Sequence, residues 1–107
     1  MSQAQHHDLA QGRWQNMTLA EQLGNVGSEY SRARKWKEQG NEQFFGKAFS
    51  RLLELLDLTI TDNRWHGPRR RELTRVRSGV CEELLGREAA GMSFNKYFDV
   101  MAVAARR

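Results

Sequence analysis

The sequence predicts an all-α protein, an up-and-down antiparallel helical bundle of three long helices and a short fourth, preceded by a polar N-terminal tail. Three observations predict this class. The chain of 107 residues contains one proline, it is rich in Leu, Ala, Glu, Gln, Arg and Lys, and no segment alternates cleanly between polar and apolar residues. Apolar residues recur instead at intervals of three and four, which is typical of amphipathic helices.

The N-terminal end is polar. Residues 1–16 carry no periodic apolar pattern, so we expect a flexible tail there and a single helical-bundle domain over residues 17–107. The alternative is that Trp14 and Met17 fold back onto the first helix as a hydrophobic staple. The adjacent His6 and His7 are interpreted as solvated residues rather than metal ligands.

Composition favours a cytoplasmic protein. The N-terminus has no apolar signal-peptide core, and no apolar run approaches the ~18 residues of a membrane-spanning helix. Cys81 is the single cysteine, which gives no intrachain disulfide and is typical of a reducing compartment. We therefore expect no membrane partner, and neither a metal nor a cofactor is predicted.

The first predicted helix, residues 19–39, begins with the capping-box pattern of Thr18 and Glu21. It carries an apolar seam, as expected for a helix packed against nearly parallel neighbours. A second stripe with the same spacing consists only of small residues, Ala20, Gly24, Gly27 and Ser31. Glycine inside a helix costs about 0.5 to 1 kcal/mol relative to alanine. Close helix packing, within the chain or across a dimer interface, is the expected compensation.

A second helix over residues 42–61 follows the pair Gly40-Asn41, in which glycine ends one helix and asparagine caps the next. One line of apolar residues along this helix includes Phe45. Further apolar residues, such as Phe44, widen the apolar surface to more than half of the circumference. Such a helix is expected to be central in the bundle or buried in a dimer interface.

Two further helices complete the predicted bundle. Pro68 is well placed at the first position of a helix over residues 68–85, which Gly86 ends. Ser93 is predicted to cap a short fourth helix. The residues expected to face inward on that helix are Phe94, Tyr97, Phe98, Met101 and Ala105. The connections are all short, which favours antiparallel neighbours.

Positive charge is concentrated in residues 64–77, which we call the basic segment. The formal net charge is +4, yet this segment contains six arginines and one carboxylate, Glu72. Cations at the start of a helix oppose its dipole, so a bound phosphate or a partner's carboxylates would compensate, and Trp65 could stack on a base. The alternative is a solvated face with Trp65 packed against the end of the bundle. The candidate anion- or nucleic-acid-binding residues are Arg64, Trp65, His66, Arg69, Arg70, Arg71 and Arg75.

The antiparallel topology gathers further cations at both ends of the bundle. Arg13, Arg106 and Arg107 are expected near the basic segment. A second basic cluster is expected at the end of the first helix, formed by Arg32, Arg34, Lys35 and Lys37. Cations at the end of a helix complement its dipole, which gives this second cluster a structural explanation.

No catalytic arrangement is predicted. The carboxylates of the second and third helices lack the Glu-x-x-His spacing of a diiron bundle, and none is expected to face the core. Cys81 is interpreted as a small core residue rather than a nucleophile. Small helical ribonucleases of the HEPN type carry an arginine shortly before a histidine, but Arg51 and Arg64 stand at the wrong distances from His66.

Residues 19–36 and 52–60 resemble small uncharacterised bacterial all-helical proteins, a resemblance that implies no activity. We expect a non-enzymatic helical interaction protein that forms a homodimer through its small-residue and apolar stripes. An RNA-, DNA- or phosphate-binding module that uses the basic segment is the alternative, and a toxin-like ribonuclease is a third. Salt dependence separates the first two, because contacts to several phosphates weaken steeply as the salt concentration rises.

Overall fold

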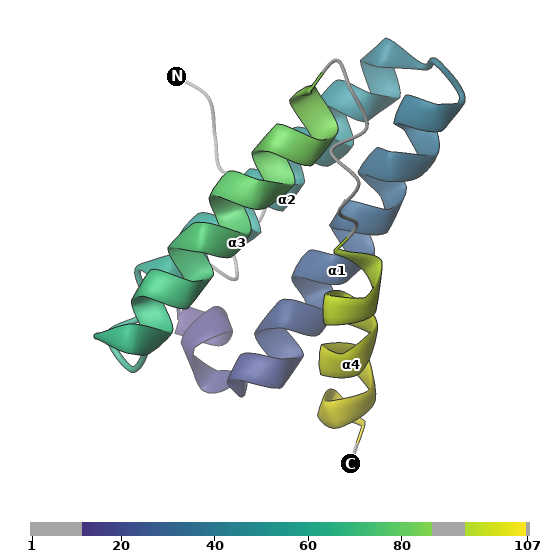
Figure 1. Ribbon diagram of the computed structural model, residues 1–107. Helices are drawn as coiled ribbons and strands as arrows, with labels where there is room; N and C mark the ends of the chain where they lie inside the picture. The colour runs from purple at the N-terminus through teal and green to yellow at the C-terminus, as the bar shows by residue number, and fades with distance from the viewer. Residues whose placement is uncertain (1–11, 87–93, 107) are drawn as a thin grey trace.

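A computed structural model describes residues 12–86 and 94–106. Within these ranges the protein is all-helical. The short 3-10 helix η2 (Trp14–Asn16) precedes four α-helices, α1 (Leu19–Glu38), α2 (Glu42–Ile60), α3 (Pro68–Leu85) and α4 (Asn95–Ala105). Successive helices run in opposite directions (Figure 1), which confirms the predicted up-and-down bundle of three long helices and a short fourth.

The ends of the helices follow local sequence signals. Thr18 and Glu21 form the predicted capping box: Glu21 N donates to Thr18 Oγ1 at 3.1 Å, and Thr18 N donates to Glu21 Oε1 at 2.9 Å. Asn41 caps α2 by accepting a hydrogen bond from Phe44 N at 3.0 Å, and Gly40 precedes it with a φ of 70°. Helix α3 has the predicted bounds, whereas α1 and α2 each end one residue earlier than expected.

Helix α1 is the central element of the bundle. It packs against α2 and against α4, while α3 packs mainly on α2 (Figure 1). The inward stripe of α2 fills the middle of the core, where Leu52, Leu55 and Leu56 are buried. Phe45 and Phe49 continue the line of Leu52 and Leu56 toward the start of α2 and pack partly buried against the core. Much of the wide apolar arc of the second helix is therefore used within the chain.

Trp14 belongs to the core although it lies in the expected tail. Its side chain is fully buried, and its indole Nε1 donates a hydrogen bond of 3.1 Å to Thr59 Oγ1 near the end of α2. Met17 packs partly buried against the same core. Trp14 and Met17 are therefore packed against the bundle, and the packed part of the chain begins before residue 17. The rest of the expected tail, residues 1–11, lies outside the described ranges.

The small-residue stripe of α1 is covered by α4. A Cβ atom added at Gly27 would lie 2.7 Å from Cβ of Phe98, and one added at Gly24 would lie 3.7 Å from the backbone of α4. The missing side chains let the two helices approach closely, so Gly24 and Gly27 are not free to contact a second copy of the chain. The other two stripe residues are Ala20, which is partly buried, and Ser31, which is exposed.

The inward face of α4 consists largely of aromatic side chains. Phe98 is buried, and Phe94 and Tyr97 pack partly buried against the core. The ring of Phe94 lies over Gly79 of α3, where an added Cβ atom would be 2.6 Å from Cζ of the ring. Helix α4 begins at Asn95, so Phe94 occupies the N-cap position that was predicted for Ser93 and makes no side-chain capping hydrogen bond, and Ser93 itself lies outside the described residues.

Candidate interaction surfaces

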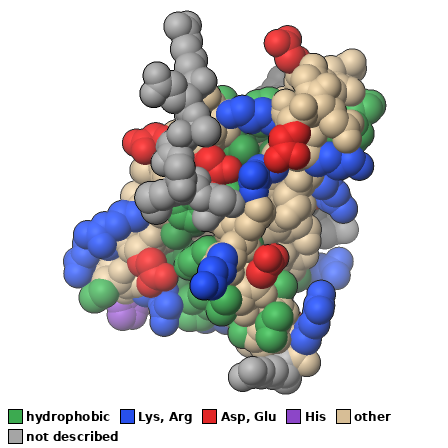
Figure 2. All heavy atoms as spheres, turned by 45° about the vertical axis from the view of Figure 1, so that its right-hand side comes forward, with side chains coloured by type: hydrophobic (Ala, Val, Ile, Leu, Met, Phe, Trp, Pro, Cys, Tyr) green, Lys and Arg blue, Asp and Glu red, His purple; other side chains and the backbone are tan. Residues whose placement is uncertain are grey.

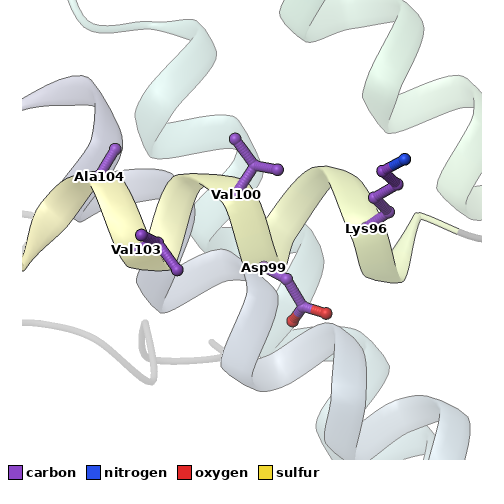
Figure 3. A pocket seen from close by; sticks show the side chains of 5 residues that line it. All are labelled: Lys96, Asp99, Val100, Val103 and Ala104. Atoms are coloured by element: carbon purple, nitrogen blue, oxygen red, sulfur yellow. The ribbon is translucent and has the colours of Figure 1, made fainter.

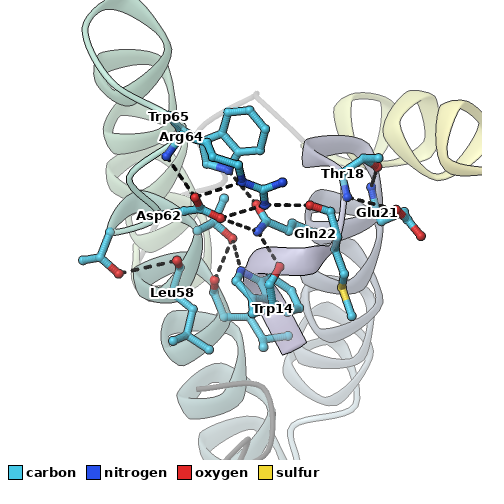
Figure 4. A network of polar contacts seen from close by, with 12 residues as sticks. Trp14, Thr18, Glu21, Gln22, Leu58, Asp62, Arg64 and Trp65 are labelled. Atoms are coloured by element: carbon cyan, nitrogen blue, oxygen red, sulfur yellow. Dashed lines mark hydrogen bonds and ion pairs between the residues drawn. The ribbon is translucent and has the colours of Figure 1, made fainter. Parts of the chain in front are cut away.

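The turn between α2 and α3 is tied to α1 through one buried carboxylate. Asp62 is 2% exposed and accepts hydrogen bonds from Arg64 Nη2 at 2.8 Å, from Arg64 N at 3.0 Å and from Gln22 Nε2 at 2.9 Å (Figure 4). The hydrogen bond from the Arg64 side chain lowers the pKa of Asp62 to about 2, against the opposing effect of burial. The expectation that no carboxylate faces the core is therefore wrong, and Glu29 on α1 is a second buried one.

Two predicted site residues are held in this network. Arg64 Nη2 also donates to Met17 O at 2.6 Å, and the guanidinium lies over the ring of Trp65, 4.6 Å from its centroid. The indole Nε1 of Trp65 donates to Gln22 Oε1 at 2.8 Å, and Gln22 Nε2 donates to Trp14 O at 2.9 Å. Arg64 and Trp65 thus hold the turn to α1. Their packing corresponds to the alternative in which the indole of Trp65 rests against the end of the bundle.

Most of the other arginines of the basic segment also have partners within the chain. Arg77 and Arg69 pair with acidic side chains at 2.8 and 3.6 Å, and Arg70 Nη2 donates to a backbone carbonyl at 3.3 Å. Within the described part of the chain, the exposed residues of the predicted site that lack a polar partner are Arg71, Arg75 and His66. Acidic side chains lie among the basic ones on the face drawn in Figure 2. The basic segment is therefore a less uniform cationic surface than its sequence indicates.

A second polar network joins α1, α3 and α4, and sequence reasoning missed it. The hydroxyl of Tyr30 donates to Glu83 Oε1 at 2.6 Å and accepts a hydrogen bond from Phe94 N at 2.9 Å. Arg34 Nε lies 3.5 Å from Glu83 Oε2. From sequence, Tyr30 is one residue of the apolar seam, and no local signal pairs its hydroxyl with a carboxylate on another helix. The network fixes the start of α4 against α1 and α3.

The outward face of α4 exposes apolar side chains, mostly in the second half of the helix. Apart from three polar residues in its first half, α4 is apolar throughout. Val100 and Val103 are 57% and 51% exposed and line a shallow concavity of about 330 Å³. Figure 3 shows Lys96, Val100 and Ala104 along one edge of the helix and Asp99 and Val103 along the other. This face was not singled out from sequence, because the pattern identified only the residues that point toward the core.

Apolar side chains are also exposed at the turn between α1 and α2 and at the nearby end of α3. Phe44 is 42% exposed and Leu85 is 60% exposed. The ring of Trp36 lies against that of Phe44, with 4.8 Å between centroids. Trp36, Phe45 and Leu85 line a groove of about 320 Å³. We call Trp36, Phe44, Phe45 and Leu85 the aromatic pole.

Among residues 12–86 and 94–106, no set of three or more His, Cys, Asp and Glu side chains is arranged to hold a metal ion. No helix in the described ranges is both long enough and apolar enough to cross a membrane. Comparison with protein families, with curated proteins and with solved structures finds no match for this chain. Function is therefore inferred from the exposed surfaces.

Proposed function

We propose that this chain is a non-enzymatic helical interaction protein that forms a homodimer through the outward face of α4. The observation that supports this best is the exposure of Val100 and Val103 on the outward face of α4, where they lie between the core-facing side of the helix and solvent. One face of α4 covers α1, and two valines that are each more than half exposed on the other face form an apolar patch of the kind that contacts another protein surface. The cytoplasmic location that the single cysteine favours is part of the proposal.

The spacing of the outward residues suits a second copy of the same helix. Lys96 lies four residues before Val100, and Ala104 lies four residues after it. In an antiparallel pair with its two-fold axis at Val100, each valine faces its counterpart and each Lys96 lies opposite Ala104 of the partner subunit. The two lysines are then ~12 Å apart along the helix axis. At physiological salt, repulsion over that distance is largely screened.

The α4 face alone makes a small interface. A helix of this length spans about 16 Å, whereas a standard interface buries about 800 Å² on each partner. Neighbouring surface has to contribute, and a groove of about 440 Å³ lies beside α4, lined in part by Arg75 and Gly79 of α3. We expect a reversible dimer with a Kd in roughly the micromolar range.

A disulfide at the two-fold axis tests this geometry. Val100→Cys in a Cys81→Ser background places two thiols face to face, and a disulfide requires Cα atoms about 4.4 to 6.8 Å apart. We expect rapid oxidation to a covalent dimer. Gln43→Cys in the same background is the matched control, because Gln43 is equally a surface residue but lies on α2, outside the proposed interface. Equal crosslinking of the two variants would contradict the proposal.

Light scattering behind size-exclusion chromatography, at low and at high salt, provides the second test. We expect a dimer that persists at high salt, because apolar contacts are not screened, and a monomer when Val100 and Val103 are both replaced by lysine. A wild-type monomer at high micromolar concentration would overturn the proposal. Nucleic acid that elutes with the protein and is lost at high salt would instead support the RNA- or DNA-binding alternative through Arg71 and Arg75.

A further inference from the structure

The aromatic pole exposes bulky side chains that the core does not require. Phe44 lies in the first turn of α2, and Leu85 is the last residue of α3. Each is more than one third exposed, so a polar residue at either position would leave the core intact. Clustered exposed aromatic and aliphatic side chains are typical of surfaces that bind other proteins.

Two lysines lie over the rings of this pole. Lys35 Nζ is 4.9 Å from the centroid of the Trp36 ring, and Lys47 Nζ is 5.7 Å from that of Phe44. Both lysines are exposed, and neither has an acidic partner in the part of the chain that the structure describes. Lys37 differs from them, because its Nζ donates to two backbone carbonyls at the end of α3, at 2.7 and 3.0 Å.

The charge that remains available at the pole is positive. Glu42 is the acidic residue among those lining the groove, and its carboxylate lies in the first turn of α2, where the helix dipole stabilises it. Lys47, in the second turn of α2, has no comparable explanation within the fold, and Lys35, which complements the dipole at the end of α1, still has no carboxylate partner in the described residues. Their ammonium groups lie over apolar rings. A partner that buries an apolar side chain against these rings can therefore pair its neighbouring carboxylates with the two lysines.

We propose that the aromatic pole binds an acidic amphipathic segment of another protein. An apolar side chain of that segment enters the groove beside Trp36, and its carboxylates pair with Lys35 and Lys47. This proposal does not rest on the dimer, because α4 packs beside Gly24 and Gly27, toward the start of α1, whereas the pole lies at the end of α1 (Figure 1).

Two synthetic peptides test whether the partner's charge is negative. Both are short amphipathic helices with leucine on one face, and the other face carries glutamate in the first peptide and lysine in the second. The full-length chain, labelled with ¹⁵N, is titrated with each peptide. We expect the acidic peptide to shift the indole N–H signal of Trp36 and the amide signals of the α1–α2 turn, and the basic peptide to leave them in place.

Charge reversal locates the contact. Replacing Lys35 and Lys47 by glutamate should weaken binding of the acidic peptide by about tenfold or more. Replacing Arg71 and Arg75 by glutamate changes the net charge by the same amount but on another surface. This control should weaken binding of the acidic peptide less than threefold. All four residues are exposed, so both variants should keep the circular dichroism of the wild type.

Three outcomes would overturn this inference. They are equal binding of the two peptides, shifts confined to α4 or to the basic segment, and an equal loss of affinity in the two charge-reversed variants. The oxidation of Val100→Cys to a covalent dimer should be unchanged in the lysine-reversed variant. Failure of peptide binding and failure of dimerisation are thereby distinguished.

Discussion

The backbone of Gly27 lies directly against the side chain of Phe98. An added Cβ atom at Gly27 would be 2.7 Å from Cβ of Phe98, closer than two such atoms normally approach. Because that neighbour is attached directly to the backbone of α4, it cannot move aside without moving the helix. The position of α4 on α1 therefore depends on a glycine at this site.

Gly27→Ala should destabilise the protein even though alanine favours helix. We expect the free energy of unfolding to fall by about 1 to 3 kcal/mol, because overpacking outweighs the gain in helix propensity. Gly46→Ala is the matched control: Gly46 lies inside α2, and beyond its own stretch of helix backbone no atom lies within 4 Å of an added Cβ, so the change should raise stability by about 0.5 to 1 kcal/mol. Urea unfolding followed by circular dichroism measures both. Equal stabilisation by the two changes would show that α4 does not pack closely at Gly27.

The hydrogen bond from Trp14 to Thr59 should contribute measurably to stability. Thr59→Val keeps the shape of the side chain but leaves the buried indole N–H without its acceptor, so we expect a loss of about 1 to 3 kcal/mol. Trp14→Phe removes the donor. In a double-mutant cycle we expect a coupling of about 0.5 kcal/mol or more. Strictly additive losses, or no loss for Trp14→Phe, would mean that Trp14 is not held in the core.

Helix bounds were predictable because their signals are local. The capping box at Thr18, the pair Gly40-Asn41 and Pro68 each act through their own backbone neighbours, and the structure places helix ends at all of them. The role of Arg64 was harder to predict, because six arginines in one segment resemble a uniform cationic surface. The nearby carboxylate of Asp62, which accepts from the backbone N–H two residues later, was the local signal available.

Interhelical partners were not predictable from one sequence. The small-residue stripe indicated that something approaches α1 closely, but the stripe does not specify which helix does so. Phe98 of α4 fills that place at Gly27, and the hydroxyl of Tyr30 binds Glu83 only because three helices converge there. Exposure of Val100 likewise follows from which face of α4 the chain itself covers.

Lys37 should stabilise the end of α3, whereas its neighbour Lys35 should not. Lys37 Nζ donates to Leu84 O at 2.7 Å and to Glu83 O at 3.0 Å, carbonyls at the negative end of the helix dipole. Lys37→Met keeps the length of the side chain and should cost about 0.3 to 1 kcal/mol. Lys35→Met, at an exposed position, should change stability by less than about 0.5 kcal/mol. Thermal unfolding of the two variants compares them, and a larger loss for Lys35→Met would be inconsistent with this capping role.

Asp62 should make the protein less stable in acid. Its pKa in the folded protein is about 2, below the ordinary 3.8, chiefly because of the hydrogen bond from Arg64. A lowered pKa means that the carboxylate contributes stability above the unfolded value and loses it as the pH falls through about 4 toward 2. The difference between the two pKa values corresponds to about 2 kcal/mol. Asp62→Asn should therefore be less stable than the wild type at neutral pH by at least about that amount, and this gap in the free energy of unfolding should narrow steadily on acidification.

Glu82→Gln removes an exposed carboxylate and serves as the control, with a small gap in stability at every pH. Urea unfolding at a series of pH values measures the two gaps. A gap for Asp62→Asn that stays constant from about pH 6 to pH 2 would show that the pair between buried Asp62 and the exposed Arg64 does not form in solution.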